Sequence, residues 1–241
     1  MSRFGLGFVS GGGTPGNDTF TKILLHMDGS NGGTTFTDVN AGGSPKTWTA
    51  TNTFGTSTTS TSNPKFGSAS LLTSNTVTYI STPYSSDFDL GTQDFAIDFW
   101  FNNNSASGGS GVGLAGNPLN SNPSLADTTW YFMRASGSIQ LTVGNGSSIA
   151  QITGSTSIVG TAWHHIAATR ASGTIRFFID GIQQGSNLSW SSIPTKAAPV
   201  LIGVSYTNAG GIANAMYDEF RLSVGIARWT SNFTPPTAQY I

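Results

Sequence analysis

The sequence predicts a single all-β domain built as an antiparallel β-sandwich. From Lys22 onward, short apolar segments alternate with polar turns, and no stretch keeps apolar residues at the 3.6-residue period of an amphipathic helix. The length of 241 residues suits one large β domain, which would bury about 70% of the surface of its unfolded chain. Cysteine is absent, so packing must hold the fold without disulfides or thiolate metal sites.

The order of apolar and polar segments predicts twelve successive strands. They are expected at residues 22–28, 46–50, 66–73, 76–81, 94–101, 128–135, 138–143, 148–152, 162–170, 174–180, 198–204 and 214–223. Two long stretches rich in Ser, Gly and Asn, 52–63 and 102–127, are too polar for a core. We therefore predict surface loops there, where binding functions are commonly located.

One hairpin has the clearest local signal. Apolar residues alternate inward over 175–179, Asp180-Gly181 has the composition of a two-residue turn, and the chain returns from Ile182 to Gln184. Asp-Gly favours this turn because both central residues need a positive φ angle. The sequence therefore predicts paired strands on either side of Asp180-Gly181.

The N-terminal segment differs in composition from the rest of the chain. Residues 1–20 are predicted to form a Gly-rich arm, and residues 21–241 the domain. Phe4, Leu6 and Phe8 are spaced by two, so an extended backbone would place them on one side. Such a segment is either a disordered tail or an assembly arm that docks onto a neighbouring subunit through these three side chains.

Charge and composition argue against several classes of partner. The chain has 10 Lys and Arg against 11 Asp and Glu, a formal net charge of -1, so we expect no nucleic-acid partner and no membrane insertion. Charged residues make up only 9% of the chain and glycines number 31, so hydroxyl and amide groups must supply solubility. Residues 1–20 contain no continuous apolar run, and we expect no signal peptide.

Several short motifs occur in a fixed order along the chain. They lie at residues 65–71, 77–80, 94–101, 163–167, 175–181 and 217–223, and include WHHIA, FIDG and YDEFRLS. Together they resemble the laminin-G-like members of the concanavalin A-like jelly-roll superfamily. The resemblance extends from about residue 24 to residue 236 and implies a jelly-roll sandwich.

The ends of the matched region carry a narrower resemblance. LLHMDG at 24–29, ARW at 227–229 and FTPP at 233–236 are similar to laminin-G-like proteins often encoded by tailed bacteriophages. In those proteins the domain tends to lie in virion appendages or on the capsid surface. The resemblance therefore implies a virion-surface protein made in the host cytoplasm, with other virion proteins or copies of itself as partners.

A glycan-binding face is expected on the strand at 94–101. Its core face is formed by alternate apolar residues, which leaves Asp94, Asp98 and Trp100 on the opposite face. An indole beside carboxylates can stack on a sugar and hydrogen-bond its hydroxyls. Alternatively, a crossing loop or a neighbouring subunit covers this face. Further aromatic candidates are Trp130, Trp190 and Trp229, of which Trp130 lies in an apolar run typical of a core.

A calcium site is a second candidate, since the resemblance implies Ca²⁺ at the sandwich rim in many relatives. On the strand at 214–223, Asp218 alternates with Met216, Phe220 and Leu222, so it is expected on the core side. A buried carboxylate needs a partner, either backbone N–H groups of an adjacent turn or a cation. Asp28 and Asp38 are candidate co-ligands. No cofactor is otherwise required.

Catalysis is not expected. Glucanases of the same superfamily need two carboxylates flanking the bond, but the chain has one glutamate, Glu219, and its nearest aspartate pair is Asp94 and Asp98. The three histidines, His26, His164 and His165, have neither a nucleophile-elbow motif nor zinc-ligand spacing, and His26 and His165 are expected to be packed and hydrogen-bonded.

Three functions are therefore weighed. The first is a non-enzymatic structural protein of a bacteriophage particle, used for capsid decoration or as a tail-appendage component. The alternative is a carbohydrate-binding adhesin that recognises a host cell-surface glycan. The third, a glycan-degrading enzyme, lacks the carboxylate pair.

Overall fold

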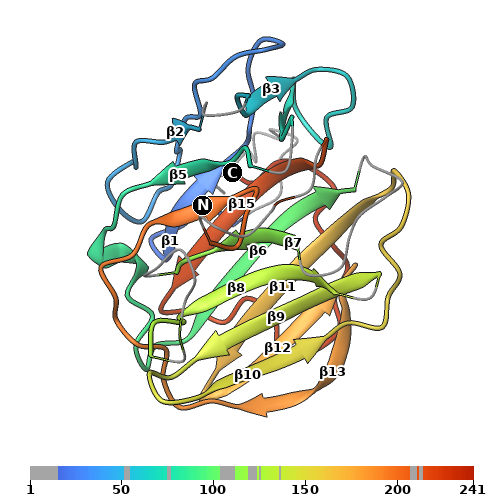
Figure 1. The fold of residues 1–241 in the computed structure, drawn as a ribbon. Helices are drawn as coiled ribbons and strands as arrows, with labels where there is room; N and C mark the ends of the chain where they lie inside the picture. Colours follow the sequence, from blue (N-terminus) through green and yellow to red (C-terminus); the bar gives the residue numbers. More distant parts are fainter. Residues whose placement is uncertain are drawn as a thin grey trace, which may run out of the picture.

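The computed structural model of the protein describes residues 16–51, 55–74, 77–103, 112–118, 124, 126–135, 137–206, 211 and 214–241. These residues form two antiparallel sheets that pack face to face as a sandwich (Figure 1). The described part contains one short 3-10 helix, η1 (Ser86–Phe88). No helix in these ranges is long and apolar enough to cross a membrane. The predicted all-β sandwich is confirmed.

One sheet has eight strands. In spatial order it contains β13 (Ile182–Ser189), β12 (Thr174–Ile179), β11 (Trp163–Ala171), β6 (Phe95–Asn102), β15 (Met216–Val224), β4 (Ser70–Leu72) and β3 (Thr58–Ser60), while β1 (Thr21–Leu25) also pairs with β15. Strands from both ends of the described chain thus meet at β15, where the candidate site lies.

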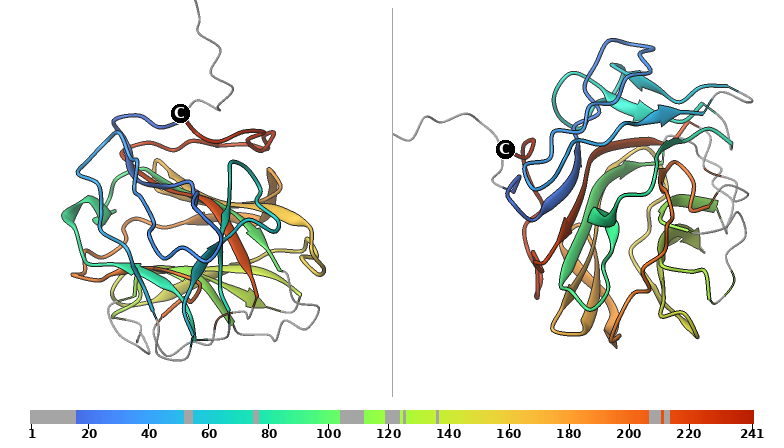
Figure 2. Two further views of the ribbon diagram at one scale, coloured as in Figure 1. Left: turned by 90° about the horizontal axis from the view of Figure 1, so that it is seen from above. Right: turned by 90° about the vertical axis from the view of Figure 1, so that its left-hand side faces the viewer.

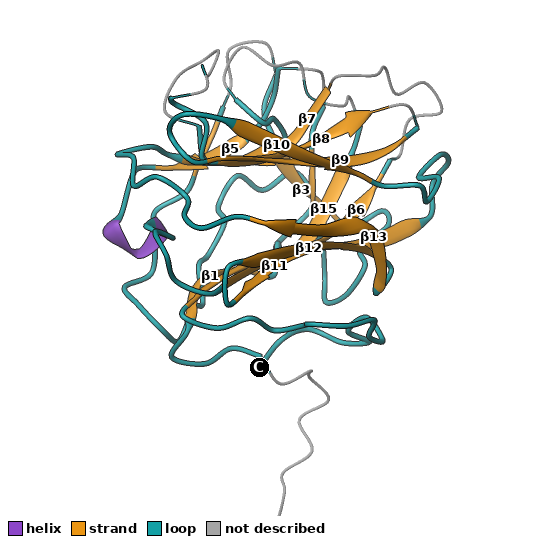
Figure 3. Cartoon of the chain, turned by 90° about the horizontal axis from the view of Figure 1, so that it is seen from below, coloured by secondary structure: helices purple, strands orange, loops and turns teal. Residues whose placement is uncertain are grey.

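The other sheet has seven strands. In spatial order these are β10 (Ile149–Thr153), β9 (Ser138–Gly144), β8 (Trp130–Ala135), β7 (Val112–Gly116), β14 (Val200–Ile202), β5 (Ile80–Thr82) and β2 (Thr49–Ala50). Figure 3 shows the two sheets as separate layers.

Aromatic side chains join the two layers in the core. Phe99 of β6 meets Phe132 of β8 edge to face, with ring centroids 5.3 Å apart, and stacks on Phe220 of β15 at 5.8 Å. All three side chains are fully buried. Such aromatic pairs favour offset or edge-to-face geometry and add stability beyond the area they bury.

The predicted hairpin is present. The turn between β12 and β13 has positive φ angles at both central residues, 52° at Asp180 and 76° at Gly181, as a two-residue hairpin turn requires. Alternate apolar residues of β12 are buried in the core, as the pattern at 175–179 predicts. The turn and the alternation set the register next to the turn, from Phe177 to Ile182, and a bulge shifts it between Ile175 and Phe177.

The prediction that 52–63 and 102–127 are surface loops is wrong in part, because β3 and β7 lie within them. Thr59 of β3 is buried, and its hydroxyl donates to the carbonyl of Ser30 at 2.5 Å. In β7, Ser205 packs directly against Gly113 and Gly116. A Cβ added at either glycine would lie within 2.4 Å of an atom of Ser205, so neither position has room for a side chain. Hydroxyl-bearing and small residues form these strands, so their composition is that of loops.

Strand β15 contains a β-bulge at Glu219, where φ is 51°. The register of its pairing with β6 shifts between Asp218 and Arg221. Tyr217 and Phe220, three residues apart, therefore both lie in the core. The expectation that Asp218 shares the core face with Phe220 is wrong, because the bulge interrupts the two-residue period. Asp218 and Arg221 lie on the face turned away from the core.

The two ends of the described chain pack together. The N–H groups of Gly16 and Asn17 both donate to the carbonyl of Ile241, at 3.2 and 3.1 Å. The guanidinium of Arg228 binds both carboxylate oxygens of Asp18, at 2.9 and 3.1 Å. Residues 16–20, expected to belong to the arm, thus contact the domain. Outside the described residues lie the expected assembly contacts, Phe4, Leu6 and Phe8.

Candidate functional site

The outer face of the eight-stranded sheet is overlaid by the last residues of the chain, 226–241, here called the C-terminal cover. Figures 2 and 3 show this segment running along the side of the sheet that faces away from the seven-stranded sheet. Within it, Trp229 stacks on Phe233 with ring centroids 4.3 Å apart, and Phe233 packs edge to face on Phe178 of β12 at 5.3 Å. A residue on this outer face of the sheet is therefore not automatically exposed.

Asp98 lies beneath the C-terminal cover and is fully buried. One carboxylate oxygen accepts from Nε of Arg221 at 2.9 Å, and the other accepts from the hydroxyl of Tyr240 at 2.6 Å and lies 3.2 Å from Nε2 of His165. Burial alone would raise the pKa of Asp98, but the charge of Arg221 and the hydrogen bonds from His165 and Tyr240 lower it to about 2. Asp98 is an ionised anchor for the cover rather than a residue on an open sugar-binding face.

Trp100 is also covered, with 6% of its surface exposed. The ammonium of Lys65 lies 3.7 Å from the centre of the indole, and Phe66 packs edge to face against it at 5.8 Å. Asp94, which remains partly exposed, accepts from the N–H of Ser172 at 2.8 Å. Asp98 and Trp100 lie on one face of β6 but are both covered, so a sugar cannot stack on Trp100 in this arrangement.

Asp218 is buried and is held by backbone N–H groups. One oxygen accepts from the N–H groups of Lys65 and Phe66, at 3.0 and 3.2 Å, and the other accepts from the N–H of Glu219 at 2.9 Å. Burial raises the pKa of Asp218 well above its usual value, although the backbone donors act in the opposite direction. Of the two alternatives for Asp218, the structure shows capping of the 65–66 turn.

The other two aspartates of the expected calcium site have partners of their own. Asp38 accepts from the N–H groups of Leu24 and Asn40, at 3.0 and 3.1 Å, and Asp28 accepts from the side-chain amide of Gln239 at 2.7 Å. Within the described residues, no group of three or more His, Asp or Glu side chains is arranged to hold a metal ion. The structure thus does not gather the three predicted ligands.

His165 and His26 are both hydrogen-bonded, as expected, but they differ in how deeply they are buried. His165 is fully buried beside Asp98, whereas His26 is partly exposed and its Nδ1 lies 2.6 Å from a carboxylate oxygen of Glu219. Burial lowers the pKa of His26, but Glu219 outweighs that effect and the net shift is upward. The second oxygen of Glu219 accepts from the N–H of Tyr240 at 2.9 Å.

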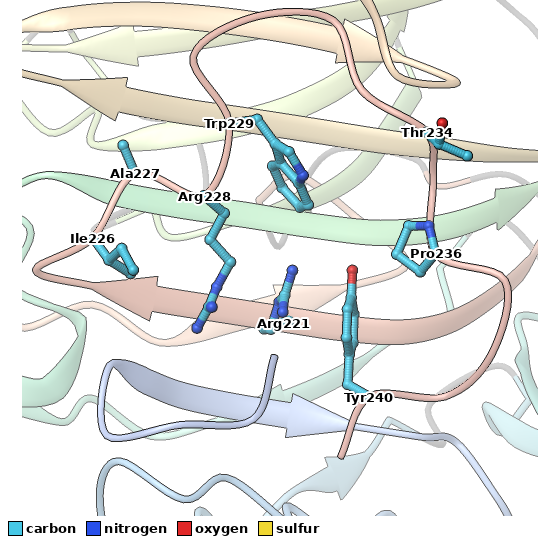
Figure 4. A pocket seen from close by; sticks show the side chains of 8 residues that line it. All are labelled: Arg221, Ile226, Ala227, Arg228, Trp229, Thr234, Pro236 and Tyr240. Carbon is cyan, nitrogen blue, oxygen red and sulfur yellow. The ribbon is translucent and has the colours of Figure 1, made fainter. Parts of the chain in front are cut away.

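A pocket opens between the C-terminal cover and β15, and we call it the Trp229 pocket. It has a volume of about 280 Å³ and is lined by Arg221, Ile226, Ala227, Arg228, Trp229, Thr234, Pro236 and Tyr240. Figure 4 shows the rings of Trp229 and Tyr240 pointing toward the same space, with the guanidinium of Arg221 between them. Ligand pockets combine apolar walls with a few convergent polar groups, and this one has both.

Arg221 supplies the charged floor of the Trp229 pocket. Its Nε donates to Asp98, its Nη1 donates to the carbonyl of Gly16 at 3.0 Å, and its Nη2 makes no hydrogen bond with the described residues. The ring of Tyr240 lies 3.6 Å from the guanidinium carbon, and that of Trp229 lies 5.5 Å away. Burial alone would lower the pKa of Arg221, but Asp98 raises it, so the group stays charged. One N–H donor group is thus fixed in place toward the pocket.

The sequence identified only part of this pocket. Trp229 is among the aromatic residues that the sequence suggests for glycan binding, and the motif at 217–223 contains Arg221. Nothing in the sequence indicates that these two residues line one pocket. No pattern in the sequence points to Tyr240, the second-last residue, as part of a site. The only available indication was the cluster of aromatic and Pro residues at 229–236, which is unusual for a tail and typical of a packed segment.

Comparisons with known proteins agree with this fold. A sequence model of the concanavalin A-like lectin/glucanases superfamily matches residues 74–225, more than half of the chain. A comparison with curated protein sequences gives no significant match. The fold seen in the structure therefore has independent support from sequence over β5 to β15.

Two solved structures with a similar fold are binding domains of toxins. The binding domain of Paraclostridial Mosquitocidal Protein 1 has a TM-score of 0.65 and 15% identity, over 86% of this chain and 49% of that one. The botulinum neurotoxin serotype D ligand-binding domain, in complex with N-acetylneuraminic acid, has a TM-score of 0.62 and 10% identity, over 89% and 49%. The chain thus spans about half the length of these two domains.

A third similar structure is matched along nearly its whole length. Domain 4 of an extracellular GH43 arabinanase from Geobacillus stearothermophilus, in complex with arabinotriose, has a TM-score of 0.60 and 16% identity, over 86% of this chain and 93% of that one. At such low identities the likeness shows a shared fold.

Proposed function

The chain belongs to the concanavalin A-like lectin/glucanases superfamily, and on that basis we propose that it is a non-catalytic glycan-binding module whose Trp229 pocket holds one sugar residue. One observation carries the proposal, namely that an aromatic wall and an unused guanidinium donor face the same small pocket. Its volume of about 280 Å³ lies at the lower end of ligand pockets.

The chemistry of the pocket walls matches that of a sugar ring. A pyranose or furanose has a face of C–H groups, which packs on an aromatic ring, and a rim of hydroxyls, which needs donors and acceptors. Trp229 is half-buried because one face of its indole stacks on Phe233, and it lines the pocket. Nη2 of Arg221, which makes no hydrogen bond with the described residues, supplies a polar donor at the floor of the pocket, and Thr234 lines the same pocket. These partners suit a hydroxyl-rich ligand.

The carboxylates support a binding rather than a catalytic role. Glu219 is 1% exposed, and both of its oxygens are occupied, one by His26 and one by the N–H of Tyr240. Asp98 has its oxygens occupied by Arg221 and by partners within the sheet and the cover. Glycoside hydrolysis needs two carboxyl groups that reach the scissile bond from either side. These two acids instead hold the C-terminal cover in place.

The similar structures support the same reading. Arabinotriose is bound by the arabinanase domain, and N-acetylneuraminic acid by the neurotoxin domain. The binding domain of botulinum neurotoxin DC, which is also similar, is in complex with SialylT in one structure and with rat synaptotagmin II in another. This chain matches about half of each toxin domain but 93% of the arabinanase domain, and we extend the glycan binding of the latter to this chain.

Trp229→Ala is expected to weaken glycan binding about tenfold, because it removes the aromatic wall, a contribution of ~1 kcal/mol beyond the buried area. The measurement is titration calorimetry with the strongest ligand found on a glycan array that includes arabinotriose and sialylated glycans. Trp163→Ala, a half-buried tryptophan outside the pocket, serves as the matched control and should bind like the wild type.

Two results would contradict this proposal in different ways. If the wild type binds nothing on the array at high avidity, the glycan-binding function is wrong. If it binds a glycan and Trp229→Ala retains full affinity with an unchanged melting temperature, the function stands but the Trp229 pocket is not the site.

A second candidate places the module on a bacteriophage particle, as a capsid decoration or tail-appendage protein. The supporting observation is the sequence of residues 1–20, where Phe4, Leu6 and Phe8 alternate in a Gly-rich segment. Deleting residues 1–15 is expected to abolish incorporation of the chain into particles and to leave the melting temperature of the domain unchanged. Electrophoresis of purified particles measures this. Normal incorporation of the shortened chain would refute docking through the arm.

A further inference from the structure

A second recess lies on the other side of the turn that follows Trp229. We call it the β13 groove. It is open to solvent, has a volume of about 790 Å³, and is lined by Arg176, Gln183, Ser186, Asn187, Thr230, Ser231 and Asn232. Every lining side chain is a hydroxyl, an amide or a guanidinium, so the groove contains no carboxylate and no aliphatic or aromatic side chain. Such walls suit a ligand that presents oxygen atoms along its length.

The amide side chains of the β13 groove are held in place by one another. Nε2 of Gln183 donates to the side-chain oxygen of Asn187 at 3.0 Å, and the N–H of Gln183 donates to the side-chain oxygen of Asn232 at 2.9 Å. Both asparagine oxygens are therefore occupied, and the Nδ2 groups of Asn187 and Asn232 make no hydrogen bond with the described residues. Two oriented N–H donor groups remain for a ligand.

Arg176 has no hydrogen-bond or salt-bridge partner among the described residues, in contrast to Arg170, Arg221 and Arg228. Arg170 donates to three backbone carbonyls, Arg221 pairs with Asp98, and Arg228 pairs with Asp18. The guanidinium of Arg176 makes no hydrogen bond or salt bridge within the described residues, and its Nη1 is buried. The only charged side chain lining the groove thus has no neutralising anion. A guanidinium of this kind binds a carboxylate with two parallel hydrogen bonds.

We propose that the β13 groove binds an acidic oligosaccharide, with a sugar carboxylate on Arg176 and neighbouring hydroxyls on Asn187 and Asn232. The inference rests on the proposed glycan-binding function. It specifies that the glycan is acidic and that it contacts the protein at the β13 groove as well as at the Trp229 pocket. The Trp229 pocket and the β13 groove share one segment, because residues 226–229 line the first and residues 230–232 line the second. A glycan of several residues can therefore contact both sides of this segment.

The test compares acidic glycans with neutral counterparts of the same size. The probes are trigalacturonate and sialyllactose, each compared with its own methyl ester. We expect at least one acidic probe to bind about tenfold more tightly than its neutral counterpart, because a carboxylate on a guanidinium forms charge-assisted hydrogen bonds. Arg176→Gln should remove this preference by lowering the affinity for the acidic probe to that for its neutral counterpart. Lys196→Gln removes the same charge at a residue outside the groove and should keep the preference.

The outcomes separate the inference from the proposed function. Equal affinity for acidic and neutral probes, or a preference that survives Arg176→Gln, would overturn the acidic-ligand inference and leave glycan binding intact. No binding of any probe would count against both. As a second readout, the side-chain N–H resonance of Arg176 should shift on addition of the acidic probe and not on addition of the neutral one.

Discussion

Asp98→Ala is expected to lower the free energy of unfolding by about 3–5 kcal/mol, because it leaves a buried guanidinium without its anion. Arg221 is 1% exposed, and Asp98 is its salt-bridge partner at 2.9 Å. The same substitution removes the acceptor of the Tyr240 hydroxyl, which ties the C-terminal cover to the sheet. Chemical denaturation followed by tryptophan fluorescence measures the change.

Asp94→Ala is the matched control for Asp98→Ala. Asp94 lies just before the same strand, is partly exposed and accepts one backbone N–H, from Ser172. Its loss is expected to cost about 1 kcal/mol, the usual value of one hydrogen bond. If Asp98→Ala costs no more than Asp94→Ala, the buried network does not hold the cover in place.

The carboxylate of Asp98 also makes the free energy of unfolding depend on pH in the acidic range. Its pKa is about 2 in the folded protein, against an ordinary value of 3.8. A carboxyl group whose pKa is lowered by folding stabilises the fold fully at any pH above its pKa in the unfolded chain. This stabilisation is lost as the pH falls through its pKa in the folded protein. The difference in unfolding free energy between the wild type and Asp98→Asn should therefore shrink as the pH is lowered from about 5 to about 2.

Gly181→Ala is expected to lower the free energy of unfolding by about 2–4 kcal/mol, because it combines backbone strain with a clash. Gly181 has a φ angle of 76°, which a side chain disfavours, and an added Cβ would lie 1.9 Å from the carbonyl oxygen of Phe233. The N–H of Phe233 also donates to the carbonyl of Gly181 at 2.9 Å. The clash would therefore push the C-terminal cover away from the hairpin.

Gly173→Ala separates strain from clash. Gly173 lies in the turn between β11 and β12 with a φ angle of 78°, and the nearest atom to an added Cβ is Nη2 of Arg170 at 3.8 Å. It should cost only about 1 kcal/mol, the effect of the φ angle alone. Thermal melts of both variants test this. Equal losses for the two variants would mean that the contact with the cover contributes nothing.

Local signals in the sequence predicted most of the architecture. Two-residue alternation identified strands such as β6 and β12, and the Asp180-Gly181 turn identified the hairpin of β12 and β13, because these features depend on neighbours in the chain. Strand β7 was missed, since its glycines are needed for close approach of residue 205, a distant segment. The bulge at Glu219 was missed for a similar reason. It changes which residues of β15 face the core, and no local pattern marks it.

The sequence correctly predicted which face of the sheet each side chain of β6 points to. It did not predict which of those side chains are exposed to solvent. Alternation correctly placed Asp98 and Trp100 on the face opposite the core, whereas their burial comes from the C-terminal cover and from Lys65 and Phe66. Covering a face is a contact between segments far apart in the chain, which periodicity does not record. The same holds for the Trp229 pocket and the β13 groove, whose walls meet only when residues 226–241 pack onto the sheet.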